Sequence, residues 1–197
     1  MTDTLSTSLN KAAVLLMDYQ PTILGNIADA PAMIGRAASV LAAARARKLP
    51  VVYIMVGFRP GYPEVNDRNP MFSGIKNAGR LLLEDSGTQI HEAVAPQAGE
   101  VVIVKPRVNA FHGTPLETIL RATGIDTLIL MGISSSGVIL STVRHAADAD
   151  YRLIVLKDCC ADSDADNHKF LMEKILPRQA SVIASADMLQ ALSAAAK

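Results

Sequence analysis

The chain has no tryptophan and few other aromatic residues, four Phe and four Tyr among 197 residues. Cysteine is almost as scarce. The two cysteines, Cys159 and Cys160, are adjacent in the sequence and cannot form an unstrained disulfide with each other. A disulfide-stabilised secreted fold is thereby excluded, and we expect the chain to work in the reducing cytoplasm with both thiols buried and inert.

An excess of charge is also missing, because 19 basic and 19 acidic residues cancel. No basic cluster stands out, so we expect no nucleic-acid partner. Half of the residues are hydrophobic, yet no run approaches the roughly 20 apolar residues of a membrane span. The first residues, MTDTLSTSLNK, contain no basic segment followed by an apolar one, so we expect neither a signal peptide nor a membrane partner.

Six short apolar runs alternate with helical patterns along the chain. Each run is continuous and rich in Val, Ile and Leu, which is typical of a parallel sheet covered on both faces. Residues 33–48 have helical spacing, and Thr114-Pro115-Leu116-Glu117 reads as a capping box. We therefore predict one α/β domain over residues 1–197, a three-layer sandwich with a mostly parallel six-stranded sheet. The predicted strands are 12–17, 51–56, 101–104, 128–131, 153–156 and 180–183.

Residues 57–99 interrupt this alternation with a long excursion that contains Gly and Pro at intervals. Long connections in compact domains are often functional, and the aromatic residues of this one argue against disorder. Ligands of open parallel sheets bind beyond the carboxyl ends of the strands. Because Asp18, Phe58, Lys105 and the turn at Gly132 all follow predicted strands, we expect them to meet in one cleft.

The segment 126–142, DTLILMGISSSGVILST, joins a buried strand to a helix through a glycine turn. Such a turn leaves backbone N–H groups free to bind an anion or a developing oxyanion. Many hydrolases carry a nucleophile near the first turn of the helix. Here that position holds Val138, which cannot attack a substrate. Ser134, Ser135 and Ser136 are read as turn residues more readily than as nucleophiles.

Three motifs follow one another in an informative order. They are Asp18 in LLMDYQ, Lys105 in VIVKPRVNAFHGTPLE and the turn GISSSGVILST. Over residues 14–187 they resemble the isochorismatase-like, or cysteine hydrolase, superfamily, which implies a Rossmann-like fold and a cis peptide between Ile133 and Ser134. Amidases of that superfamily use an Asp–Lys–Cys triad, and matching the turns puts Val138 at the position of the Cys.

The resemblance implies a small-molecule hydrolase even without that cysteine. Isochorismatases proper also lack it and protonate a vinyl ether with the Asp. We therefore predict that Asp18 and Lys105 transfer a proton and that the backbone amides of Ser134 and Val138 form an anion hole, with no cofactor. Two alternatives stay open: a catalytically silent relative that binds ligands or forms oligomers, and an ordinary cysteine amidase if the turns are matched wrongly.

The aromatic residues after the second and third strands are candidates to line the pocket. Arg59 suits the carboxylate of a small, planar, partly anionic ligand. His112 is equally compatible with facing water. The predicted substrate-binding residues are Gln20, Phe58, Arg59, Tyr62, Phe111, His112, Ser135 and Ser136.

Apolar residues of the excursion predict a second subunit. A small loop cannot easily bury the apolar surface of Met71, Phe72 and Ile75. We therefore expect a homo-oligomer, a dimer or tetramer, whose second subunit closes the cleft. The alternative is that these residues pack beneath their own loop.

The acidic segment 162–173 resembles a calcium-binding loop in the spacing of its carboxylates. Its sixth position is Asn167 rather than Gly, and helical spacing begins within it, so we interpret these carboxylates as helix N-terminal residues and predict no metal site. The remaining histidines are expected on ordinary helix faces; they are His91, His145 and His168.

Overall fold

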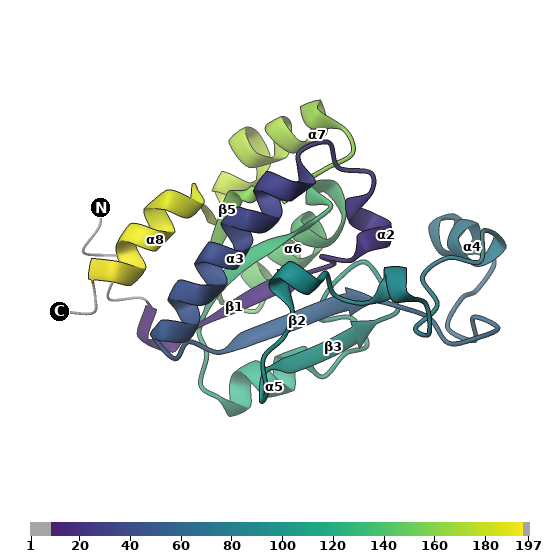
Figure 1. Ribbon diagram of the computed structural model, residues 1–197, viewed down its shortest axis with the longest axis horizontal. Helices are drawn as coiled ribbons and strands as arrows, with labels where there is room; N and C mark the ends of the chain where they lie inside the picture. The colour runs from purple at the N-terminus through teal and green to yellow at the C-terminus, as the bar shows by residue number, and fades with distance from the viewer. Residues whose placement is uncertain (1–8, 195–197) are drawn as a thin grey trace.

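A computed structural model describes residues 9–194 (Figure 1). Its sheet has six strands in the order β3-β2-β1-β4-β5-β6, and every neighbouring pair is parallel. The predicted α/β class and six-stranded sheet are confirmed, and the sheet is entirely parallel. The strands are β1 (Ala12–Met17), β2 (Val51–Val56), β3 (Val101–Lys105), β4 (Thr127–Ile133), β5 (Arg152–Ala161) and β6 (Ser181–Ile183).

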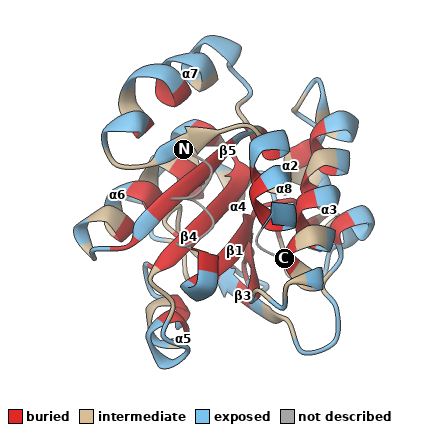
Figure 2. Cartoon of the chain, turned by 90° about the vertical axis from the view of Figure 1, so that its left-hand side faces the viewer, coloured by how far each residue is buried: buried red, intermediate tan, exposed pale blue. Residues whose placement is uncertain are grey.

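Helices cover both faces of the sheet, which makes the predicted three layers (Figures 1 and 2). Alternate residues of β1 enter two separate apolar cores, one beneath α3 and α8 and the other beneath α5 and α6. The α-helices are α2 (Pro21–Leu24), α3 (Ala30–Ala46), α4 (Pro70–Asn77), α5 (Leu116–Ala122), α6 (Leu140–Asp148), α7 (Ala165–Phe170) and α8 (Ser185–Ala194). Short helical turns are η1 (Leu9–Lys11), η2 (Ser86–Thr88), η3 (Glu92–Val94), η4 (Ser135–Ile139), η5 (Leu171–Ile175) and η6 (Leu176–Arg178).

Within residues 9–194, no helix is long and apolar enough to cross a membrane. Most of the N-terminal segment for which we expect no signal peptide lies outside the described residues, as do both ends of the predicted domain.

Strand β3 departs from the prediction that every strand is covered on both faces. It lies at an edge of the sheet, and Val102 and Val104 are 45% and 42% exposed, whereas Ile103 is buried. Continuous apolar sequence therefore did not distinguish an edge strand from a central one.

The predicted capping box before α5 is also wrong. The Thr114 Oγ1 accepts a hydrogen bond from the Leu116 N–H at 3.3 Å and donates one to the Ala110 carbonyl at 2.6 Å. Glu117 does not reach back to Thr114, because it forms an ion pair with Arg121 one turn later at 2.7 Å. The helix start at this place is stabilised from one side only.

The excursion after β2 folds around a small apolar cluster of its own, formed by Val56, Phe58, Tyr62, Phe72 and Leu81. Ile75 packs against this cluster, so the alternative that these residues lie beneath their own loop holds for Phe72 and Ile75. Met71 remains 58% exposed. The homo-oligomer stays a prediction. Helix α4 extends beyond the carboxyl ends of β2 and β3 (Figure 1).

Candidate active site

Asp18 stands directly after β1, and its backbone is held in an unusual conformation. Its N–H donates a hydrogen bond to the Ile54 carbonyl at 2.7 Å, and its φ is +59°. This left-handed region is uncommon for residues other than glycine, although Asp and Asn enter it more readily than most. The turn brings the carboxyl group to the end of the sheet while leaving it only 6% exposed.

Lys105 ends β3, two strands away from β1, and its side chain reaches back to Asp18. The Lys105 Nζ lies 2.8 Å from Asp18 Oδ2, and the lysine side chain is 2% exposed. Nζ also donates to the Arg107 carbonyl at 3.1 Å. The predicted contact between Asp18 and Lys105 is thereby confirmed.

The second oxygen of the Asp18 carboxyl group, Oδ1, is buried and forms no hydrogen bond of normal geometry with a described residue, although the Val56 backbone N–H lies near the carboxyl group. Burial raises the pKa of Asp18, and the ammonium group of Lys105 together with the backbone N–H of Val56 partly offsets this effect. A carboxyl group with this environment keeps its proton to a higher pH than an exposed aspartate, which suits it to proton transfer.

The glycine turn begins beside Asp18, because strands β1 and β4 pair Met17 with Gly132. A Cβ at position 132 would lie 3.1 Å from the Met17 carbonyl oxygen, so any other residue would require β1 to shift by a small amount. The Ile133–Ser134 peptide is cis, as the resemblance implied. Val138 lies in the π-helical turn η4 and is 2% exposed.

Gly137 lies close to Ser134 in the same turn. The Ser134 Oγ accepts a hydrogen bond from the Gly137 N–H at 3.1 Å, and a Cβ at position 137 would lie only 2.7 Å from that oxygen. Ser134 is therefore a turn-capping residue, as its sequence context predicted.

Ser135 and Ser136 bind neighbouring segments, and the predicted substrate contacts stay a prediction. Ser135 is buried, its hydroxyl donates to the Ala161 carbonyl at 3.2 Å, and its Oγ lies 2.7 Å from His168 Nδ1. The Ser136 N–H and hydroxyl both donate to Asp162 Oδ2, at 2.8 and 2.6 Å. These bonds attach the turn to β5 and α7.

His168 is consequently more than the ordinary helix-face residue that we expected. It is half-buried, and burial lowers its pKa while nearby Asp162 raises it. The contact with Ser135 joins residues 33 positions apart, and no local sequence pattern signals it.

Gln20 is fully buried, and its amide group is occupied by the fold. Its Nε2 donates to the carbonyls of Val56 at 2.8 Å and Thr88 at 2.5 Å, and its Oε1 accepts from the Val56 N–H. This side chain ties the end of β2 to η2, and a contact between Gln20 and a substrate stays a prediction.

The aromatic residues predicted to wall the cleft lie in apolar cores instead. Phe58 packs against Tyr62 and Phe72 with ring centroids 5.6 and 5.8 Å apart, and Phe58 is fully buried. Phe111 stacks on His145 at 4.5 Å, beneath α6. Burial of large apolar rings thus outweighs their proximity to the strand ends.

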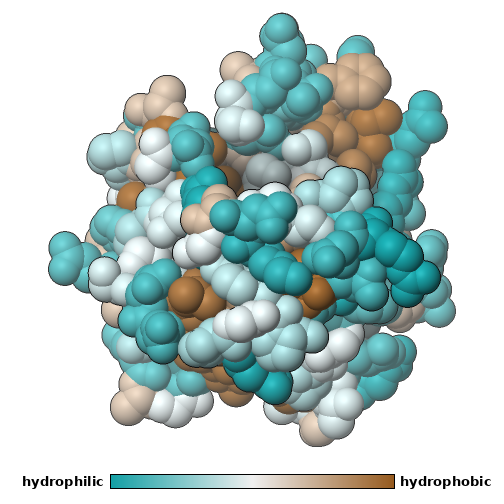
Figure 3. Space-filling model, turned by 90° about the vertical axis from the view of Figure 1, so that its right-hand side faces the viewer, coloured by the Kyte–Doolittle hydropathy of each residue, from teal (hydrophilic) through white to brown (hydrophobic). Residues whose placement is uncertain are grey.

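Two predicted ligand residues are exposed. The Arg59 side chain is 73% exposed, and its Nε lies 3.1 Å from Glu64 Oε1. His112 faces water. Figure 3 views the side on which α4 lies, and hydrophilic residues cover most of that face.

Arg107 was missed by the sequence reasoning. Its Nη2 donates to the Glu64 carbonyl at 3.0 Å and its Nη1 to the Pro106 carbonyl at 2.6 Å. The guanidinium carbon lies 5.4 Å from the centre of the Phe72 ring. Arg107 therefore connects the loop after β3 to the excursion.

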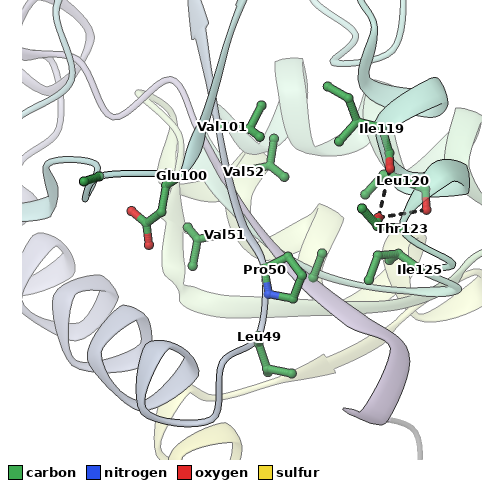
Figure 4. Close-up of a pocket in the computed structure, with 13 residues that line it drawn as sticks. Leu49, Pro50, Val51, Val52, Glu100, Val101, Ile119, Leu120, Thr123 and Ile125 are labelled. Carbon is green, nitrogen blue, oxygen red and sulfur yellow. Dashed lines mark hydrogen bonds between the residues drawn. The ribbon is translucent and has the colours of Figure 1, made fainter.

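Two cavities lie apart from Asp18 and Lys105. One of about 310 Å³ is at the amino ends of the strands, beside Glu100 (Figure 4). Its wall includes the apolar side chains of Val52, Leu120 and Ile125. The other, of about 260 Å³, lies between α3 and α7 and is lined in part by His168. Neither is the cleft that we expected.

The part of the chain that the structure describes contains no group of three or more His, Cys, Asp or Glu side chains able to hold a metal ion. The acidic segment serves instead as predicted at a helix start, because Asp164 Oδ1 accepts hydrogen bonds from the N–H groups of Asp166 and Asn167. Both cysteines are buried and free, and burial raises the pKa of the Cys159 thiol to about 12 and raises that of Cys160 further.

The chain belongs to the isochorismatase family, because the isochorismatase domain matches residues 12–187. It is 31% identical to an uncharacterized isochorismatase family protein of Escherichia coli O157:H7, covering 91% of this chain and 95% of that protein. It is 32% identical to maleamate amidohydrolase of Pseudomonas putida, covering 92% and 87%. The solved structure of an isochorismatase family protein from Burkholderia thailandensis matches with a TM-score of 0.82 and 26% identity, covering 93% and 96%. The chain is accordingly a hydrolase of this family.

Proposed function

We propose that this chain is a single-domain hydrolase of small molecules in which Asp18 and Lys105 transfer protons and no cysteine acts as nucleophile. The observation that carries the proposal is the buried Asp18 carboxyl group. One of its oxygens lies 2.8 Å from the Lys105 ammonium, and the other has no partner among the described residues.

Asp18 Oδ1 is the atom proposed to deliver the proton. Because burial raises the pKa of Asp18, the protonated carboxyl persists closer to neutral pH. Lys105 then stabilises the carboxylate that remains after transfer. A positioned general acid of this kind accelerates reactions by roughly 10²–10⁴-fold.

The backbone amides of Ser134 and Val138 are the proposed anion hole. Support comes from the strand register, since the turn that contains Ser134 starts beside Asp18. Developing negative charge on a substrate oxygen would be stabilised there while Asp18 supplies the proton.

Val138 supports a mechanism without a thiolate. It occupies the position that the resemblance assigns to the catalytic Cys, and it is apolar and buried. The raised pKa of Cys159 and of Cys160 disfavours a thiolate at either residue. Water is then the proposed attacking group, and the proton that it releases returns to the Asp18 carboxylate left by the first transfer.

The relatives suggest the substrates to try first. Maleamate amidohydrolase is named for an amide, so a panel should contain maleamate and other small carboxyamides beside vinyl ethers of hydroxy acids. We expect the wild type to hydrolyse a member of this panel and Asp18→Asn to lose that turnover. Hydrolysis that persists in Asp18→Asn would contradict the proposed proton transfer.

Val138→Cys is the sharpest test of the nucleophile position. We expect this variant to gain iodoacetamide-sensitive amide hydrolysis and Asp18→Asn/Val138→Cys to lack it, with Val143→Cys on α6 as the control for a new buried thiol. Thiol-sensitive amide hydrolysis by the wild type, abolished by Cys160→Ser, would favour the ordinary cysteine amidase instead.

A catalytically silent ligand-binding relative is the second candidate, and the valine at the nucleophile position favours it. It predicts saturable binding of a panel compound without turnover in either wild type or Asp18→Asn. A cytoplasmic homo-oligomer completes the proposal, and light scattering on the purified protein at micromolar concentration tests its size.

A further inference from the structure

We infer that Arg107 is a positioning residue that couples the excursion between β2 and β3 to the Asp18–Lys105 pair. This inference rests on the proposed function of that pair. A continuous chain of contacts runs from Phe72 and Glu64 through Arg107 to Lys105 and Asp18, although these residues come from three separate segments.

The first link is the backbone of Arg107. Its carbonyl oxygen accepts a hydrogen bond from Lys105 Nζ at 3.1 Å, while the same ammonium lies 2.8 Å from Asp18 Oδ2. Two anchors thus hold the lysine side chain between β1 and the loop after β3. Moving the Arg107 carbonyl would remove one of these two anchors and let the Lys105 ammonium move away from Asp18.

The second link is the guanidinium group, which fixes where that carbonyl lies. It donates to the carbonyls of Pro106 and Glu64, and it lies over the Phe72 ring at 5.4 Å. The planar group satisfies two acceptors and covers an aromatic face at once, which a lysine ammonium cannot reproduce.

The excursion itself needs such an attachment. Helix α4 extends away from the sheet (Figure 1), and Phe72 is its one buried residue. Since Arg107 binds both the ring of Phe72 and the backbone at Glu64, a displacement of the excursion is transmitted to the partner of Lys105. The excursion thereby acts on the proton-transfer pair without contributing a side chain to it.

The test measures the pair in the unliganded protein and needs no substrate. Carboxyl carbons of ¹³C-labelled aspartate are titrated by NMR, with Asp18 assigned from Asp18→Asn, and the rate at which acetic anhydride labels Lys105 is measured by mass spectrometry. We expect Arg107→Met to move the Asp18 titration to higher pH and to speed Lys105 labelling severalfold. Arg107→Lys, which restores the charge without the planar group, should give the same changes to a smaller extent.

Two further variants keep the test decisive. Phe72→Leu removes the ring from the other side of the contact and should shift both readouts in the same direction, so it decides the matter if Arg107→Met does not fold. Arg68→Met removes a cation of the same excursion whose Nε bonds Asn66, and it should change neither readout. Unchanged titration and labelling in a folded Arg107→Met, or equal changes in Arg68→Met, would overturn the inference. Because no turnover is measured, this outcome is independent of whether the proposed hydrolysis is found.

Discussion

Two ion pairs, Arg45–Glu100 and Lys105–Asp18, occupy opposite ends of the same sheet. They differ in the number of hydrogen bonds that the carboxylate accepts. At the amino ends, Glu100 receives hydrogen bonds from Arg45 on both oxygens at 2.8 Å and another from the Gln97 N–H at 2.7 Å. At the carboxyl ends, Asp18 binds Lys105 through one oxygen only.

The two environments shift the pKa values of the two carboxyl groups in opposite directions. Hydrogen bonds from Arg45 lower the pKa of Glu100, whereas burial raises the pKa of Asp18. The Glu100 carboxylate accepts hydrogen bonds on both oxygens, so it is held in its charged form and supports the fold. The buried Asp18 carboxyl group is bonded to Lys105 through one oxygen, so the other oxygen can carry a proton. The cavity of Figure 4 lies beside Glu100 rather than Asp18.

The largest contrast between the two pairs should be in turnover. Asp18→Asn is expected to lower kcat on an active panel compound by roughly 10²–10⁴-fold, because it removes the proposed general acid. Glu100→Gln should leave kcat within about twofold, since it lies at the other end of the sheet. Steady-state kinetics of both variants decide this, and equal losses would abolish the distinction.

The next largest difference between the two ion pairs should be in their contribution to the free energy of unfolding. Lys105→Met removes one partner of a pair whose side chains are 2% and 6% exposed, so we expect the free energy of unfolding to fall by about 3–5 kcal/mol. Asp18→Asn/Lys105→Met should recover part of that loss, because no unpaired charge remains buried. Urea unfolding monitored by circular dichroism measures both, and a double variant less stable than Lys105→Met would contradict the argument.

Loss of the Glu100 carboxylate should have a smaller effect. Its side chain is 13% exposed and its hydrogen bonds come from a charged group, so Glu100→Gln is expected to cost about 1.5–3 kcal/mol. The same urea experiment gives this value, with the exposed Glu173→Gln as the control.

The pH dependence of stability should have opposite signs for the two carboxyl groups. The pKa of Asp18 is raised in the folded state, so its contribution is present below its ordinary value of 3.8 and is lost as pH rises through the raised pKa. The pKa of Glu100 is lowered, so its contribution is present above 4.5 and is lost as pH falls. Subtracting the unfolding curves of Asp18→Asn and of Glu100→Gln from the wild type should therefore give slopes of opposite sign.

The smallest expected effect is that of thiol reagents. Both cysteines are buried on β5 and have raised pKa values, so iodoacetamide should leave any wild-type turnover unchanged. Mass spectrometry should find neither thiol alkylated in the folded protein. Inactivation that follows modification of Cys160 would show that a thiol takes part.

The sequence was most informative about elements whose signal is local. Six apolar runs predicted the six strands, and the order of the three motifs predicted that Asp18 and Lys105 meet. Side-chain direction after a strand is not a local property. Phe58 and Phe111 were placed near the site because they follow strands, yet each turns into an apolar core.

Hydrogen bonds between residues far apart in the chain could not be predicted from the sequence either. Gln20 bonds Thr88 across 68 residues, and Ser135 contacts His168 across 33. Polar side chains beside a strand end can bind a ligand or satisfy distant backbone groups, and composition does not separate these outcomes. Only the assembled fold shows which acceptors remain without a well-placed donor among residues 9–194, as at Asp18 Oδ1.

The left-handed backbone of Asp18 narrows the routes by which this site can evolve. At φ +59° a β-branched or bulky residue is strained, whereas Asn and Gly are tolerated. Position 18 is thus restricted by backbone geometry as well as by proton chemistry. Descendants that abandon the reaction but keep the fold are therefore expected to carry Asn or Gly there more often than a β-branched residue.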